Sequence, residues 1–198
     1  MTDPQPARYR RLATICRPKG RREITSPALD SRLLRLSKAS KKNLDLFVEG
    51  ISLEAAFGTS INDLVERATA DRLHLGEHFL SVADRMRRSR TRDWRSVIGR
   101  YYYAMYHSMR GVCFYSFGGD DNQDHARILN YVPDDFPQKA LRVNELKDAR
   151  LRRNEADYDP YPKDATQFRP AAILLGQTAN NFVAECRSYL SAKGVSHL

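Results

Sequence analysis

Residues 94–117 read WRSVIGRYYYAMYHSMRGVCFYSF, and this stretch decides the fold of the 198-residue chain. Asp93 precedes the stretch as a helix N-cap, and Gly118 and Gly119 follow it as a stop signal. The sequence therefore predicts one continuous helix over residues 94–117. Apolar side chains recur along it every three or four residues, as they do on the buried face of an amphipathic helix, and this expected core stripe consists of Ile98, Tyr102, Met105, Met109 and Cys113.

The other face of this helix carries an arginine and a histidine seven residues apart. At about 100° per residue, Arg100 and His107 lie about 20° from full register and about 10.5 Å apart along the helix axis. Both side chains therefore project from one face, flanked by Tyr103. Ala104 and Gly111 lie on the same face, and small side chains allow another helix to approach closely. We therefore expect these two residues to form the helix contact of a two-fold homodimer.

Arginine and histidine on one face form a pair that suits phosphate chemistry. A guanidinium presents a planar fork of donors to phosphate oxygens, and an imidazole gives and takes protons near neutral pH. Together, Arg100 and His107 would suffice for RNA cleavage without a metal ion. Such a pair also arises by chance on many helices, so the spacing alone does not establish catalysis.

On the N-terminal side of this helix, the pattern predicts two more helices. The first is expected over residues 26–49, begun by a Ser-Pro pair and stopped by Gly50. Residues 50–60 are interpreted as a linker. The second helix is expected from residue 59 or 60 to Met86, with a break at Gly76 left open.

On the C-terminal side, the sequence predicts a short turn of helix over residues 126–131 and a helix from Pro137 to Leu151. Residues 156–170 contain three prolines and are expected to form an extended loop. A last helix is expected over residues 171–192. Strand-like alternation is absent, so the expected fold is all-α, an up-down helical bundle with a basic, partly helical N-terminal extension.

Charge divides the chain into two parts. Residues 1–50 carry 12 Lys/Arg against 5 Asp/Glu, a net charge of +7, whereas residues 51–198 carry 21 against 19, a net of +2. We therefore expect a basic N-terminal arm plus helix over residues 1–58 and the helical bundle over residues 59–194. The arm either contacts nucleic acid or an acidic partner or serves as a solvated tail. A second basic cluster, Arg85 to Arg95, directly precedes the central helix.

Several functional classes have no support in the sequence. No apolar run is long enough to span a membrane, and residues 1–22 lack the apolar segment of a secretory signal, so a cytoplasmic protein is expected. Cys16, Cys113 and Cys186 are too widely spaced for a disulfide framework or a zinc site. His74 and His78 lack a third ligand. No phosphate-binding glycine loop is present, and no metal or other cofactor is expected.

Two motifs together resemble those of the HEPN domain family. Residues 100–107, RYYYAMYH, resemble the Arg-x4–6-His signature helix of that family. Residues 153–158, RNEADY, resemble a second element of its stand-alone prokaryotic members. His125 lies where those members often have a polar residue, at the start of the loop after the motif helix. The resemblance covers residues 60–193.

The resemblance implies a helical bundle that dimerises through the Arg100–His107 helix. Many HEPN proteins are metal-independent endoribonucleases of toxin–antitoxin or antiviral-defence systems, often paired with a nucleotidyltransferase or antitoxin. If Arg100 and His107 cleave RNA through the 2′-hydroxyl, the products are expected to carry 2′,3′-cyclic phosphate ends. By position, Arg100 and His107 are the candidate catalytic pair. The remaining candidate RNA-binding or site-shaping residues are Tyr103, Arg95, Arg92, Arg153, Asp157 and Tyr158.

The alternative is a non-catalytic HEPN module that binds nucleotide, RNA or a nucleotidyltransferase or antitoxin partner. Active members often have a polar residue directly after the arginine, where this chain has Tyr101. Tyr103 is the best candidate for stacking on a base, and His125 is a further candidate at the cleft. Asp157 also has a purely structural interpretation, as a partner of Arg153.

Overall fold

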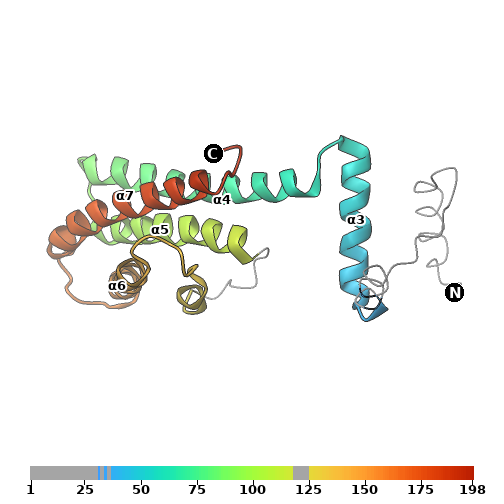
Figure 1. Ribbon diagram of the computed structural model, residues 1–198. Helices are drawn as coiled ribbons and strands as arrows, with labels where there is room; N and C mark the ends of the chain where they lie inside the picture. The colour runs from blue at the N-terminus through green and yellow to red at the C-terminus, as the bar shows by residue number, and fades with distance from the viewer. Residues whose placement is uncertain (1–30, 32–33, 35–36, 118–124) are drawn as a thin grey trace, which may run out of the picture. The chain divides into compact units, whose positions relative to one another are not determined.

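The structure, a computed structural model, describes residues 31, 34, 37–117 and 125–198. The chain divides into two compact units, Met1–Ile61 and Asn62–Leu198. Helices account for the secondary structure throughout the described part, and no strand occurs in it (Figure 1). The prediction of an all-α helical bundle is therefore confirmed.

The first unit contains helix α3, Lys41–Phe57. Ser40 begins it, because its hydroxyl accepts a hydrogen bond from the Asn43 backbone N–H at 3.3 Å. Gly58 ends it with φ 64°, a left-handed conformation that glycine adopts without steric cost. None of the residues of α3 is buried.

The prediction of a helix over residues 26–49 followed by a linker over 50–60 is wrong where the structure describes it. Residues 38–40 are not helical, and Gly50 lies inside α3. A glycine inside a helix costs only about 1 kcal/mol relative to alanine, so Gly50 alone does not stop it. Residues 26–30 lie outside the described residues.

The second unit is built from four long helices: α4 (Ile61–Arg88), α5 (Trp94–Phe117), α6 (Lys139–Tyr158) and α7 (Arg169–Ala192). In Figure 1, α4, α5 and α7 run across the view, whereas α6 is seen nearly end-on. The predicted helix over residues 94–117 is confirmed, and Asp93 caps it by accepting from the Ser96 backbone N–H at 3.3 Å. Helix α4 passes through Gly76 without a break.

Two short 3-10 helices connect the long ones. The first, η1 (Arg127–Tyr131), matches the predicted turn over residues 126–131, and the second is η2 (Ala165–Phe168). The predicted loop over 156–170 begins and ends inside helices, because α6 continues to Tyr158 and α7 starts at Arg169. The prolines do not exclude helix from all of this segment. Pro160 lies just after the end of α6, and Pro170 lies in the first turn of α7, where a proline is tolerated.

Helix α5 is the centre of the bundle. Its predicted core stripe is buried, and Ile98, Met105 and Met109 are 0% exposed. Burying a side chain of this size stabilises the fold by about 1.5–3 kcal/mol. On the other face of α5, Arg100 is exposed, and Tyr103 and His107 are partly exposed.

The small residues of α5 face α4 of the same chain. A Cβ added to Gly76 of α4 would lie 2.9 Å from the Ala104 carbonyl oxygen, and one added to Gly111 would lie 3.3 Å from the Thr69 carbonyl oxygen. The side chain of Ala104 is 0% exposed. The prediction that Ala104 and Gly111 meet a second copy of the chain is therefore wrong: the close helix contact that small residues permit is made within the chain.

Candidate functional site

Arg100 and His107 both lie beside one aromatic ring of α4. The His107 imidazole stacks on the Phe79 ring, with the ring centroids 5.2 Å apart and an interplanar angle of 8°. The Arg100 guanidinium carbon lies 5.7 Å from the centroid of the same ring. Arg100 is exposed and His107 is half-buried. Phe79 therefore links the two candidate catalytic side chains, two helical turns apart on α5.

Phe79 is a site residue that the sequence did not reveal. The residue belongs to the apolar pattern of α4, where it reads as one core position among many. Its functional position depends on how α4 packs against α5. The glycine at position 76 was the available signal, because it permits the close approach of the two helices that brings Phe79 to His107.

Aromatic rings surround His107. The Tyr103 and Tyr106 ring centroids lie 6.2 Å and 5.2 Å from that of His107. Burial lowers the pKa of His107 to about 4, with smaller contributions from Arg110, His125 and Arg72. The imidazole is therefore neutral at neutral pH and able to accept a proton.

The second motif, residues 153–158, lies against the motif helix through Tyr103. An Nη2–H of Arg153 donates to the Tyr103 hydroxyl at 2.9 Å. The Arg153 Nε lies 2.7 Å from an oxygen of Asp157, and the Tyr158 ring centroid lies 5.3 Å from the guanidinium carbon. The structure thus brings Arg153, Asp157 and Tyr158 together with Tyr103, as a rim beside the Arg100–His107 face.

His125 lies against three tyrosines of α5, namely Tyr102, Tyr103 and Tyr106. Its Nδ1 lies 2.5 Å from the Tyr102 hydroxyl oxygen. Its imidazole stacks on the Tyr106 ring, with centroids 4.0 Å apart and an interplanar angle of 9°. His107 and His125 therefore both contact Tyr106.

Arg92 lies just before α5 and Arg95 lies in its first turn, and the two side chains have different contacts. Arg95 Nη1 donates to the carbonyl oxygens of Ala156 and Asp159, and its Nη2 donates to that of Pro162, each at 2.8 Å. These bonds hold the end of α6 and the following loop, so Arg95 shapes the site and does not direct its guanidinium to a ligand. Arg92 is exposed, with its guanidinium carbon 5.8 Å from the Trp94 ring centroid.

Tyr101 does not belong to the candidate site. Its side chain is 0% exposed, and its hydroxyl donates to Asp84 of α4 at 2.6 Å. Gly176 of α7 leaves room for this ring, since an added Cβ would lie 2.8 Å from Tyr101 Cζ. The tyrosine directly after Arg100 is thus a core residue, and it supplies no polar group to the Arg100–His107 face.

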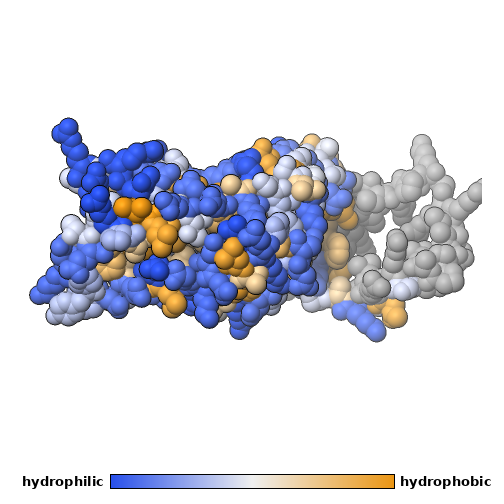
Figure 2. All heavy atoms as spheres, turned by 60° about the vertical axis from the view of Figure 1, so that its left-hand side comes forward, coloured by the Kyte–Doolittle hydropathy of each residue, from blue (hydrophilic) through white to orange (hydrophobic). Residues whose placement is uncertain are grey.

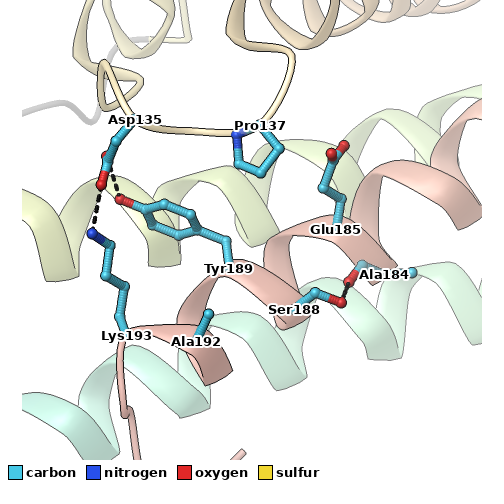
Figure 3. A pocket seen from close by; sticks show the side chains of 8 residues that line it. All are labelled: Asp135, Pro137, Ala184, Glu185, Ser188, Tyr189, Ala192 and Lys193. Carbon is cyan, nitrogen blue, oxygen red and sulfur yellow. Dashed lines mark hydrogen bonds and ion pairs between the residues drawn. The ribbon is translucent and has the colours of Figure 1, made fainter.

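Two hollows lie away from this face. One, of about 630 Å³, is formed by the C-terminal half of α7 and the segment before α6 (Figure 3). In it, the Tyr189 hydroxyl and Lys193 Nζ both point to the Asp135 carboxylate, at 2.8 Å and 2.5 Å. The other, of about 530 Å³, is lined by residues of α4, α5 and α7 that include Asp84, Arg87 and Asn180. Neither hollow includes Arg100 or His107.

Within the described ranges, no group of three or more His, Cys, Asp or Glu side chains is placed to hold a metal ion. Cys113 and Cys186 are buried as free thiols, and burial raises the pKa of Cys113 to about 12. No helix of the described part has the length and apolar character needed to cross a membrane.

Comparison of the chain with models of protein families, with curated proteins and with solved structures found no match.

Proposed function

We propose that this protein is a metal-independent endoribonuclease of the HEPN type, with Arg100 and His107 as its catalytic pair. The observation that carries the proposal is that the Arg100 guanidinium and the His107 imidazole both contact the ring of Phe79. A phosphodiester at the edge of that ring would meet a permanent positive charge on one side and a neutral imidazole on the other.

The chemistry assigned to each residue follows from its environment. His107, with a pKa of about 4, is neutral at pH 7 and takes the proton of a ribose 2′-hydroxyl. Arg100 is exposed and donates hydrogen bonds to the phosphate, whose charge increases in the transition state. The 2′-oxygen then attacks phosphorus, and cleavage leaves a 2′,3′-cyclic phosphate and a 5′-hydroxyl.

Further arginines near the candidate site favour a substrate that carries several negative charges. Arg72 and Arg110 both act electrostatically on His107. Arg153 donates to the Tyr103 hydroxyl and also pairs with Asp157. With Arg100, the first two arginines would attract phosphates to His107. The exposed ring of Tyr158, next to Arg153, offers a surface on which a base would stack.

The proposal includes a cytoplasmic homodimer and a toxin or antiviral role with a nucleotidyltransferase or antitoxin partner. Since Ala104 and Gly111 are covered by α4, a dimer through α5 would have to use the exposed edge around Arg100 and His107. Hydrophilic residues predominate on the face shown in Figure 2, and hydrophobic residues gather there in small separate patches. That face therefore shows no large apolar surface that would indicate a dimer contact. Analytical ultracentrifugation would measure whether the protein is a monomer or a dimer.

The decisive experiment is incubation of the purified protein with RNA in EDTA, comparing wild type with His107→Ala. Wild type should produce fragments with 2′,3′-cyclic phosphate ends, and His107→Ala should lose cleavage by at least a hundredfold while keeping most RNA binding. The matched control is His197→Ala, because His197 pairs with Asp63 at 2.9 Å, away from the Phe79 contact. Cleavage that requires a divalent metal, or that persists in His107→Ala, would contradict the mechanism.

A second candidate function is a non-catalytic module that binds RNA, nucleotide or a partner protein. It is favoured by the lack of a polar side chain directly after Arg100, since Tyr101 is buried in the core. In that case wild type would bind RNA without cutting it. Arg100→Ala would then weaken binding, whereas His107→Ala would leave both binding and RNA integrity unchanged.

A further inference from the structure

The second histidine near Tyr106 has no role in the mechanism above. We propose that His125 is the general acid of the site, which protonates the 5′-oxygen that leaves when His107 activates the 2′-hydroxyl. This inference rests on the proposed function and assigns a second catalytic residue to it.

The first support is the position of His125. His107 contacts Tyr106 with ring centroids 5.2 Å apart, and His125 stacks on the same ring at 4.0 Å. Both imidazoles also lie 6.2 Å, centroid to centroid, from Tyr103. Two proton carriers therefore lie beside the same pair of rings. In-line cleavage uses two such groups, because the attacking and the leaving oxygen lie on opposite sides of phosphorus.

The second support is the hydrogen bond that orients His125. The Tyr102 hydroxyl lies 2.5 Å from Nδ1, on a side chain that is only 1% exposed. Burial raises the pKa of Tyr102, so the phenol keeps its proton. In the imidazolium form of His125 both ring nitrogens carry a proton, and Nδ1–H then donates to the phenol oxygen. A fixed partner at Nδ1 leaves Nε2 as the nitrogen that carries the transferred proton, and it prevents the ring from flipping.

The third support is the different environment of the two histidines. His107 is held neutral by burial against Phe79 and by nearby arginines, which suits a base. A base and an acid on the same reaction must differ in protonation before the reaction starts, and different surroundings produce that difference. The proposal therefore assigns the imidazolium form to His125, whose Nδ1 is hydrogen-bonded to the Tyr102 hydroxyl.

The step balances with these two groups. The 2′-hydroxyl gives its proton to His107, the 2′-oxygen forms a bond to phosphorus, and the bond between phosphorus and the 5′-oxygen breaks with its electron pair on oxygen. His125 Nε2–H gives its proton to that oxygen, which leaves as a hydroxyl. Water restores both protonation states by exchange.

The test uses two matched short RNAs, one natural and one with sulfur in place of the bridging 5′-oxygen at the single cleavable linkage. A thiolate leaves without receiving a proton, so the sulfur substrate does not need a general acid. The variants are His125→Ala and His125→Phe, and the second of these preserves a ring to stack on Tyr106. Circular dichroism and melting curves check that each variant is folded.

Both His125 variants should cleave the natural RNA at least a hundredfold more slowly than wild type and the sulfur RNA within about tenfold of it. His107→Ala should lose activity on both substrates. Equal loss on both substrates in the His125 variants, or no loss on natural RNA, would overturn the assignment while leaving the catalytic role of His107 intact. A wild-type protein that cuts neither substrate would overturn the proposed function and this inference with it.

Discussion

The surroundings of His107 depend partly on its position along α5 and partly on the packing of other segments against that helix. The sequence predicts that it shares a helix face with Arg100, and in the structure both side chains lie beside the Phe79 ring. The sequence also suggested His125 as a candidate at the cleft, but it did not indicate Phe79, because the approach of that residue depends on how α4 packs against α5. Local helical geometry is therefore predictable from spacing, whereas the lowered pKa of His107 results mainly from burial, which depends on how the helices pack.

The first prediction concerns pH. The pKa of His107 in the folded protein is about 4, below its value of 6.5 without burial. The activity, measured as kcat/KM, should therefore keep its acidic limb near pH 4, because the base stays neutral down to that pH.

Protein stability should change over the same pH range. The folded state binds fewer protons at His107 than the unfolded state between these two pKa values, so stability is fully present above about pH 6.5 and falls as pH drops toward 4. His107→Gln should reduce the loss of melting temperature between pH 7 and pH 5. An acidic limb near 6.5, or an unchanged loss in the variant, would show that His107 is not buried as described.

At the scale of helices, the long elements were predictable and their partners were not. The start and the length of α5 follow from Asp93 and from the apolar period, both of which are local. The small residues Ala104 and Gly111 correctly indicate a close helix contact, but composition cannot tell whether the other helix belongs to the same chain. For α3, the capping residues Ser40 and Gly58 outweighed the glycine at position 50 that suggested a stop.

The α4–α5 contact yields a stability prediction. Gly76→Ala should destabilise the protein by about 1–3 kcal/mol, because its Cβ would lie 2.9 Å from both the Ala104 carbonyl oxygen and the Ser108 backbone nitrogen. These are backbone atoms of the central helix and cannot move aside. Gly111→Leu should likewise unfold the bundle, because Thr69 of α4 is in the way.

The matched control is Gly50→Ala in α3. There the added Cβ would meet the terminal carbon of Ile61 at 3.3 Å, which is the mobile end of a flexible side chain. The helix should gain up to about 1 kcal/mol from alanine. Urea denaturation of the three variants measures the differences. A Gly76→Ala protein as stable as wild type would show that α4 does not approach α5 this closely.

For the whole molecule, the uneven distribution of charge along the chain can be read from the sequence alone. The net charge of +7 over residues 1–50 does not depend on where those residues lie. Residues 1–25 contain seven arginines and lysines, and they lie outside the described residues. The all-helical class was also predictable, since it sums many local preferences, whereas the distribution of arginines around His107 required the packed bundle.

Deleting residues 1–25 should flatten the dependence of RNA affinity on salt. Each phosphate contact that is lost reduces the slope of log affinity against log salt by about 0.7 for a single strand. Fluorescence anisotropy with a labelled single-stranded RNA at several salt concentrations gives the slope. A shortened protein with the same affinity and the same slope would assign the arm to a solvated tail or to protein contacts.

The hydrogen bonds of Arg95 to three carbonyl oxygens have a consequence for how this protein can change over evolutionary time. Its guanidinium binds the main-chain oxygens of Ala156, Asp159 and Pro162, and every amino acid supplies such an oxygen. The rim next to Tyr158 can therefore accept new side chains at positions 159–161 while its path is preserved. In a library randomised there, most members should fold while Arg95 is intact, and few should fold once Arg95 is replaced by alanine. As long as Arg95 is kept, positions 159–161 could therefore vary, and such changes could alter which substrates the rim contacts.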